Sequence, residues 1–317
     1  MTTVVWFKRD LRTHDHAPLV AAAALGEPVI PLYVIEDDYW QLPDTSGRQW
    51  QFIRDSLTDL DRQLRAAGSR LWVLRGTVLD AFKQLKANHG IRRIFCHQET
   101  GGQWTFDRDK SVIQWSAENG LEFQEWRQFG VVRRLADRDL WDNAWTDLMR
   151  DSTLGAPGHI PGGGGGPTGD WQLAPQTLGL ADDCPDRQAG GSARGEKLLS
   201  SFLDRRCVGY QYNISSPNTA FRACSRLSPH IAYGTVSLRE IYQHAKAAGQ
   251  HRNTLPRKKK SLTSFRSRLH WHCHFIQKLE SEPAIEFRNL HHGYDGLRES
   301  AWNADHFDAL VAGRTGW

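Results

Sequence analysis

Five short apolar runs, separated by helical patterns, limit the fold of this chain most strongly. They occupy residues 3–7 (TVVWF), 28–34 (PVIPLYV), 70–76 (RLWVLRG), 92–97 (RRIFCH) and 121–126 (LEFQEW). Runs of this length between amphipathic stretches are typical of strands that are buried on both faces of a sheet. Because strands that alternate with helices form βαβ units, residues 1–130 are predicted to form an α/β domain with a doubly wound parallel sheet.

Open parallel sheets bind ligands at the carboxyl ends of their strands. The first such end in this chain is the stretch FKRDLR at residues 7–12. No GxGxxG motif follows the first apolar run, so the usual dinucleotide-binding fingerprint is not expected here.

Residues 131–195 are predicted to be an inter-domain linker. Their centre reads GAPGHIPGGGGGPTGDW and contains five consecutive glycines, Gly162–Gly166, flanked by prolines. Such a composition does not hold a regular element and is typical of a flexible connection. A phosphate-cradling loop is the alternative, but the Lys-Ser/Thr ending and the preceding strand that such a loop needs are missing.

The pattern of residues 196–317 is helical. One helix is expected in GEKLLSSFLDRRC (195–207), one from near Ser237 with that serine as its cap, and one over 261–280. Arg268, Trp271 and Phe275 form a stripe along the last helix. An adjacent stripe is apolar and is predicted to face a core, and it consists of Leu262, Phe265, Leu269, Cys273 and Ile276.

Three alternating histidines, His270, His272 and His274, raise the question of a metal site in this helix. Successive alternate positions of a helix point about 200° apart, so the three rings do not converge. Only His270 and His274 share a face, and two histidines make a weak site, so no metal is predicted. His272 beside Trp271 and Arg268 favours the cationic, aromatic wall of a cavity, and an ordinary amphipathic helix with a basic outer side is the alternative.

Charge is distributed unevenly along the chain, whose formal net charge is +4. Residues 205–278 contain fourteen Lys or Arg and one acidic residue, Glu240, which gives this segment a net charge of +13. The remaining residues are acidic, with a net charge of −9. This contrast favours a polyanion as partner, and a solvated basic face without a partner is the alternative.

The cysteines and the apolar runs indicate the compartment. Five scattered cysteines without a CxxC pair are typical of reduced thiols, so a cytoplasmic protein is expected. No secretory signal is expected at Met1, because Lys8, Arg9 and Asp10 interrupt the first apolar run. No run approaches the roughly 18 apolar residues of a membrane helix.

Several stretches together resemble the photolyase/cryptochrome family. VVWFKRDLRTHDHAPL (4–19) resembles its opening strand and turn, and ACSRLSPHIAYGTVSLREIY (223–242) resembles its flavin phosphate-binding segment. Tyr212 precedes Cys224 by twelve residues, a spacing that also matches. SFRSRLHWH (264–272) is similar to the helix that faces the pocket, and FDALVAGRTGW (307–317) to the lead-in to the second half of the flavin domain.

The resemblance implies an antenna-type α/β domain followed by an all-α FAD-binding domain over residues 196–317. Family members continue past the Gly-Arg-Thr-Gly stretch, so this domain is expected to be incomplete, without most contacts to the isoalloxazine ring. An antenna chromophore of folate or deazaflavin type is a further implication, and no motif in the chain identifies which.

The resemblance also implies a function. The expected reaction is light-dependent repair of pyrimidine dimers in damaged DNA by an electron from reduced FAD, as in a deoxyribodipyrimidine photolyase-type lyase, with activity impaired by truncation. Two alternatives stay open, a cryptochrome-like blue-light sensor and a non-catalytic nucleic-acid-binding remnant. No sequence feature indicates an oligomer, and a monomer is expected.

Site residues follow from the matched motifs. Trp271 matches the tryptophan that stacks on the damaged bases, and His272 is expected beside it. Arg268 stands where the family commonly has a glutamate, which leaves the usual dimer specificity open. The basic run Arg257, Lys258, Lys259 and Lys260 is expected to contact backbone phosphates. The resemblance assigns FAD binding to Tyr212, Cys224, Ser225, Arg226, Leu227, Ser228 and Phe265, with Cys224 at a position where a hydroxyl is usual.

Overall fold

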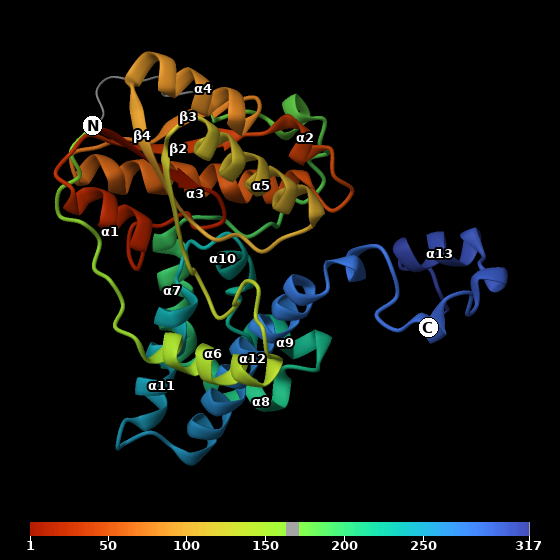
Figure 1. The fold of residues 1–317 in the computed structure, drawn as a ribbon. Coiled ribbons are helices and arrows are strands. Elements are labelled where there is room, and N and C mark those ends of the chain that lie inside the picture. The colour runs from red at the N-terminus through yellow and green to blue at the C-terminus, as the bar shows by residue number, and fades with distance from the viewer. Residues whose placement is uncertain (163–170, 317) are drawn as a thin grey trace.

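A parallel sheet wrapped by helices and a separate bundle of helices make up the body of the molecule (Figure 1). The computed structural model describes residues 1–162 and 171–316. Of the predicted five-glycine run, only Gly162 lies within the described residues. We call the first unit the sheet part and the second the helical part.

Five parallel strands in the order β3-β2-β1-β4-β5 form the sheet. The strands are β1 (Thr2–Phe7), β2 (Val29–Ile35), β3 (Trp72–Arg75), β4 (Ile91–His97) and β5 (Glu122–Trp126). These bounds follow the five apolar runs closely, and the predicted α/β fold with a doubly wound sheet is confirmed. The strand order reverses between β1 and β4, which opens a crevice at their carboxyl ends.

Helices cover both faces of the sheet. On one face α1 (Ala17–Ala24) and α3 (Gly47–Ala66) pack against Val5 and Phe7. On the other face α4 (Val78–His89) and α5 (Gln103–Glu118) pack against Val4 and Trp6. Successive residues of β1 therefore point to opposite layers, which is why its sequence is a continuous apolar run. The short helix α2 (Asp37–Trp40) follows β2.

The helical part has its own core. Its main helices are α7 (Ser192–Asp204), α11 (Leu238–Gln250) and α12 (Pro256–Ser281), and α6 (Trp141–Arg150) packs with them through three buried side chains. Shorter helices and 3₁₀ turns complete the chain: α8 (Tyr210–Asn213), α9 (Pro217–Ala223), α10 (Ser228–Ala232), α13 (Ala304–Val311), Arg138–Leu140, Pro175–Leu178, Arg206–Gly209, Pro283–Glu286, His292–Tyr294 and Glu299–Ala301.

The segment predicted as a linker is packed against both parts where the structure describes it. Helix α6 contributes Trp141, Trp145 and Met149 to the helical core, although no helix was expected within 131–195. Ile160 and Leu178 belong instead to the core of the sheet part. The domain bounds 1–130, 131–195 and 196–317 remain predictions, and the described contacts give this segment a structural role in each unit.

Helix α12 differs from its predicted bounds at the amino end. It begins at Pro256, five residues earlier than expected, because proline is favoured in the first turn, where its missing N–H is not needed. The basic run 257–260 is therefore helical. Leu262, Phe265, Leu269 and Cys273 of the apolar stripe face the core as predicted, but Ile276 is only partly buried. Gln277 is buried in its place and holds the backbone of Val132 through two hydrogen bonds. Ser237 caps α11 with Glu240 in a capping box.

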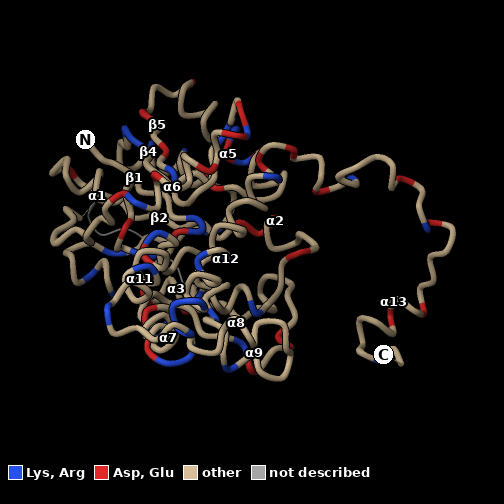
Figure 2. Tube along the Cα trace, turned by 90° about the horizontal axis from the view of Figure 1, so that it is seen from below, with Lys and Arg blue, Asp and Glu red and all other residues tan. Residues whose placement is uncertain are grey.

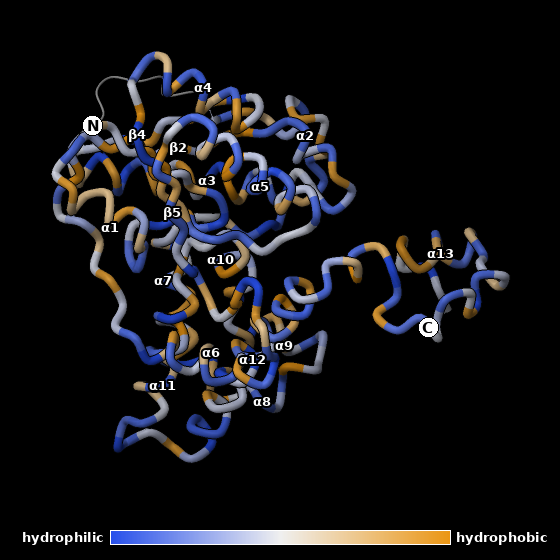
Figure 3. The backbone as a smooth tube through the Cα atoms, viewed as in Figure 1, coloured by the Kyte–Doolittle hydropathy of each residue, from blue (hydrophilic) through white to orange (hydrophobic). Residues whose placement is uncertain are grey.

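Residues 282–316 form an arm that leaves the body of the molecule (Figures 1 and 3). Glu286 anchors its start, since its carboxylate accepts the backbone N–H of Gln103 at 2.6 Å. Beyond this point eight large apolar side chains are exposed: Phe287, Leu290, Tyr294, Leu297, Trp302, Phe307, Leu310 and Val311. Within the described residues, no helix combines the length and the apolar character needed to cross a membrane.

Two side chains from the loop after β1 tie the sheet part to the helical part. The buried Arg12 donates to the carbonyl oxygen of Gly234 at 2.9 Å, and the carboxylate of Asp15 accepts from Arg239 and Ser237. Burial opposes ionisation of Asp15, but the hydrogen bonds from Arg239 and Ser237 outweigh it and hold the pKa of this carboxyl below its ordinary value. We call these contacts the inter-part latch.

Replacement of the latch carboxylate should destabilise the protein strongly. Asp15→Ala leaves Arg239 without its buried partner, so the free energy of unfolding in urea is expected to fall by about 3 kcal/mol near neutral pH. The depressed pKa of Asp15 means that this stabilisation is present above the pKa of the unfolded chain and is lost as the pH falls through the folded value.

Asp80→Ala is the matched control, because Asp80 pairs with Lys83 on an exposed surface, where such pairs contribute about 1 kcal/mol or less. Equal losses of stability in the two variants would contradict the role assigned to Asp15.

Candidate functional site

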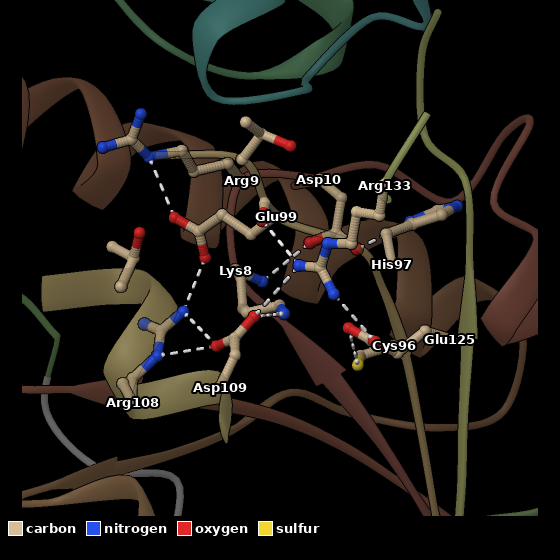
Figure 4. Close-up of polar contacts among 12 residues, drawn as sticks. Lys8, Arg9, Asp10, Cys96, His97, Glu99, Arg108, Asp109, Glu125 and Arg133 are labelled. Atoms are coloured by element: carbon tan, nitrogen blue, oxygen red, sulfur yellow. Dashed lines mark hydrogen bonds and ion pairs between the residues drawn. The ribbon is translucent and has the colours of Figure 1, made fainter. Parts of the chain in front are cut away.

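Buried charges gather at the carboxyl ends of β1 and β4 (Figure 4). Lys8 Nζ lies 2.8 Å from Asp109 Oδ2, and both side chains are almost fully buried. Arg108 contacts Asp109 at 2.8 Å, Glu99 at 2.6 Å and Glu36 at 3.0 Å. Burial lowers the pKa of Lys8, but Asp109, Cys96 and Glu99 together outweigh it and raise that pKa overall. The cluster is therefore a compensated ion network that stiffens the crevice.

Little room is left inside this crevice. The space between Trp6, Tyr39, Glu99, Arg108 and Tyr233 measures about 40 Å³, close to the volume of one water molecule. A larger hollow of about 420 Å³ adjoins it between α2, α4 and α5. The antenna chromophore remains a prediction, and of these two spaces the outer hollow is the one with room for a ring system of that kind.

Asp10, His16 and His97 form the one close group of three potential metal ligands among residues 1–162 and 171–316. Asp10 Oδ2 lies 2.9 Å from His16 Nε2 and 2.8 Å from His97 Nδ1. His16 Nδ1 accepts the backbone N–H of Leu19, so the proton of its neutral ring is on Nε2. A metal bound at Nε2 would need a lone pair on that nitrogen as well, but a neutral imidazole ring has only one free lone pair, and Nδ1 already uses it. We therefore describe Asp10, His16 and His97 as a hydrogen-bond network in which the proton of His16 is held on Nε2.

The sequence contained the signal for this network. Asp10 and His16 follow the first apolar run, and His97 ends the fourth, so all three lie at the same edge of a parallel sheet. The order of the strands was needed to see that β1 and β4 are neighbours.

Two predicted flavin-binding residues lie in the helical core. Phe265 is buried between Phe202 and Tyr210, with ring centroids 4.7 Å and 5.6 Å away, and Leu227 is fully buried. Tyr212, in contrast, is 60% exposed, and the Arg257 guanidinium lies 4.8 Å from its ring centroid. Tyr212 is thus open to a ligand, whereas Phe265 meets other side chains.

The turn over residues 224–228 presents a polar edge. The N–H of Leu227 donates to Ser225 Oγ at 3.3 Å, and the buried face of the turn is held by Arg206, which donates to the carbonyl oxygens of Cys224 and Ser225. Arg206 therefore supports the turn and is not free for a DNA phosphate. Ser228, the first residue of α10, is exposed.

Arg226 has its backbone in the left-handed region, with φ of 65°. Its guanidinium lies 3.9 Å from the ring centroid of Phe221 on α9. Non-glycine residues adopt this conformation rarely, and they do so where the surroundings impose it. The side chain is therefore directed toward α9, while Tyr212 lies beside α12.

Arg257, Arg268 and Trp271 lie along one side of α12. Arg257 and Arg268 are eleven residues apart, which rotates them by only about 20° around the helix axis. Trp271 is 48% exposed, and the Arg268 guanidinium lies 5.9 Å from its ring centroid. The exposed Phe275, one turn further along, continues the stripe.

The remaining predicted nucleic-acid contacts point elsewhere. His272 lies against Phe129, with ring centroids 6.2 Å apart, and burial lowers its pKa. Lys258 lines a groove between α7 and α11, and Lys259 and Lys260 are exposed. Figure 2 shows the cationic positions gathered around α7, α8 and α12.

Burial of the neutral His97 should make stability depend on pH. Burial lowers the pKa of His97 to about 3, so the unfolded chain binds this proton first as the pH falls below about 6.5. The free energy of unfolding is therefore expected to fall between pH 6.5 and 3, with a slope of up to about 1.4 kcal/mol per pH unit from this group.

His97→Asn provides the test, because the asparagine amide keeps a donor toward Asp10 but does not titrate. Urea unfolding at several pH values should show a shallower slope for this variant. A slope identical to that of the parent protein would exclude His97 as its source.

Comparison with known proteins gives the relationship. The DNA photolyase family matches residues 3–132. Deoxyribodipyrimidine photo-lyases of Agrobacterium fabrum and Streptomyces griseus are 26% and 28% identical to this chain over 99% of its length. Cryptochrome-1 of Sinapis alba is 26% identical over 77% of this chain, which covers 52% of that protein.

A solved structure agrees in fold. The class III photolyase of Agrobacterium tumefaciens superposes with a TM-score of 0.84 at 22% identity, over all of this chain and 66% of the photolyase chain. This chain also spans 66% and 68% of the two photo-lyases matched in sequence, or about two thirds of their length. Residues 3–132 thus match the DNA photolyase family, and the whole chain is similar in fold to a photolyase and in sequence to photo-lyases.

Proposed function

We propose that this protein is a photolyase-type lyase that uses FAD and light to repair pyrimidine dimers in DNA. The observation that carries the proposal is the exposed Trp271 beside Arg268, on a cationic side of α12. The matches to two deoxyribodipyrimidine photo-lyases, which extend over 99% of this chain, support it.

The residues present fit the phosphate end of a flavin dinucleotide. The hydroxyls of Tyr212 and Ser228 are in exposed residues, and neither forms a hydrogen bond within the described chain. Both can donate to phosphate oxygens, as can backbone N–H groups of the 224–228 turn. Phe265 would not touch the isoalloxazine ring, since Phe202 and Tyr210 enclose it. When bound, reduced FAD would supply the electron that splits the dimer.

The turn and the tryptophan side of α12 adjoin the same residue, Tyr210. Burial and the nearby Cys224 raise the pKa of Tyr210 and the nearby Arg268 opposes them, with a result of about 12. Tyr210 is thus near both Cys224 and Arg268. A ligand held at the turn would therefore have the Arg268 end of the stripe within its neighbourhood.

In DNA binding, Trp271 would contact the damaged base and the arginines would contact phosphates. Extrusion of a damaged base costs a few kcal/mol, and less where pairing is already weakened. Stacking on the Trp271 ring would recover about 1–3 kcal/mol of that cost. Arg268 and Arg257 would meet phosphates on the same side of α12.

Trp271→Ala should reduce both binding and repair of dimer-containing DNA. Loss of a stacking contact of about 1–3 kcal/mol corresponds to a roughly 5- to 150-fold weaker affinity. Fluorescence anisotropy would measure binding, and recovery of absorbance at 260 nm under light would measure repair by the flavin-reduced protein. Phe287→Ala, which removes an exposed ring from the arm, is the control. Equal behaviour of the two variants would contradict the role of Trp271.

Salt dependence should report the phosphate contacts of α12. Arg257→Ala and Arg268→Ala are each expected to lower the slope of log affinity against log salt by about 1. Lys83→Ala, on the exposed surface of α4, should leave the slope unchanged. If all three variants keep the slope of the parent protein, the DNA does not lie along this side of the helix.

A blue-light sensor is the second candidate. The match to Cryptochrome-1 of Sinapis alba favours it, because that protein resembles this chain over 77% of its length. A protein that binds flavin and changes its absorbance in light without removing dimers would support the sensor. A colourless preparation that still binds DNA would instead support a non-catalytic remnant.

A further inference from the structure

A second cationic hollow lies beside the turn, on the side of α7 and α9. Its volume is about 670 Å³, within the range of about 300–1,000 Å³ that is usual for small-molecule sites. No acidic side chain lines it. Five of its lining side chains are cationic, namely Arg194, Lys197, Arg206, Arg222 and Arg226.

These cations are not neutralised by the protein. No ion pair or hydrogen bond involves the side chains of Arg194, Lys197 and Arg222 within the described ranges 1–162 and 171–316. Arg206 donates only to neutral oxygens, and the contact of Arg226 is with the Phe221 ring. The hollow therefore concentrates positive charge that no carboxylate of its own lining balances.

Like charges around one concavity repel, and low-dielectric walls strengthen their field inside it. Burial and the neighbouring charge of Arg226 both lower the pKa of Arg206, which agrees with this crowding. A bound polyanion would relieve the repulsion. The left-handed backbone of Arg226 directs a fifth charge into the same space.

One aromatic ring at this hollow indicates that a ligand bound there would carry a planar base in addition to its anionic groups. Phe221 is 68% exposed, and Arg226 covers one face of its ring. The exposed remainder of the ring can stack on a planar base. Cations for phosphates and a ring for a base together match a nucleotide.

We propose that this hollow binds a nucleoside diphosphate, with its phosphates among Arg194, Lys197, Arg222 and Arg226 and its base on Phe221. The hollow shares Arg226 with the turn proposed for the FAD phosphates, but Tyr212, Ser228 and Trp271 do not line it, so the proposed site adjoins the one proposed for FAD and is distinct from it. The proposal does not depend on dimer repair or on bound flavin.

Calorimetry on the flavin-free full chain at constant salt would test the proposal, with ADP, inorganic pyrophosphate and adenosine as probes. ADP should bind most tightly and adenosine most weakly. Lys197→Ala and Arg222→Ala should each weaken ADP and pyrophosphate roughly ten-fold, because each removes a charged contact. Phe221→Leu should weaken ADP but not pyrophosphate.

Lys259→Ala is the matched control, since Lys259 is an exposed cation of α12 outside the hollow. Absence of pyrophosphate binding, or equal effects of Lys197→Ala, Arg222→Ala and Lys259→Ala, would overturn the proposal. Circular dichroism of each variant would confirm that the fold is intact.

Competition would identify the source of the phosphates. FAD and a short single-stranded oligonucleotide should both leave the affinity for ADP unchanged. Displacement of ADP by FAD but not by FMN would show that the hollow is the adenosine end of the flavin site. Displacement by the oligonucleotide would show a DNA backbone contact. Either displacement would overturn a separate site, whereas failed dimer repair with intact ADP binding would count only against the proposed function.

Discussion

The buried contacts of Arg12 and Asp15 determine how the two halves of the molecule work together. Both residues belong to the loop that leaves β1, and their partners Gly234, Ser237 and Arg239 belong to the loop and first turn before and within α11. Because a buried charge without its partner is costly, this geometry has few alternatives. It fixes the 224–228 turn and α12 relative to the crevice of the sheet.

Helix α12 has a core side and an open side. Its apolar side, with Leu262, Leu269 and Cys273, fills the helical core, and its open side presents Arg257, Arg268 and Trp271. Since both sides belong to one rigid element, the side chains proposed to contact DNA keep their spacing. The turn at Arg226 adds a different surface that faces α7 and α9. The basic segment 205–278 therefore forms two separate cationic surfaces, although its composition alone suggests one continuous patch.

Local patterns predicted the elements well, and tertiary partners were harder to predict. The strands and the cap at Ser237 follow from hydrophobic period and capping chemistry, which act over a few residues. Helix α6 was missed although its buried residues, Trp141, Trp145 and Met149, stand at helical spacing, because residues 131–195 were interpreted as one linker from their glycine-rich centre. The apolar stripe predicted that Phe265 faces a core, but its partners Phe202 and Tyr210 lie more than fifty residues earlier in the chain and could not be predicted from local pattern. The ligand contacts of the other predicted site residues remain predictions.

The arm over residues 282–316 affects the behaviour of this protein in solution, whereas the hydrophobic cores stabilise its fold. Its rings and aliphatic chains take no part in either hydrophobic core, yet they are the largest group of apolar side chains in contact with water within one segment. Apolar area gains about 25 cal/mol for each Å² removed from water, so contact between two such arms is favourable. Colloidal stability at high concentration would therefore depend on the arm, and removal of the arm would leave both hydrophobic cores intact.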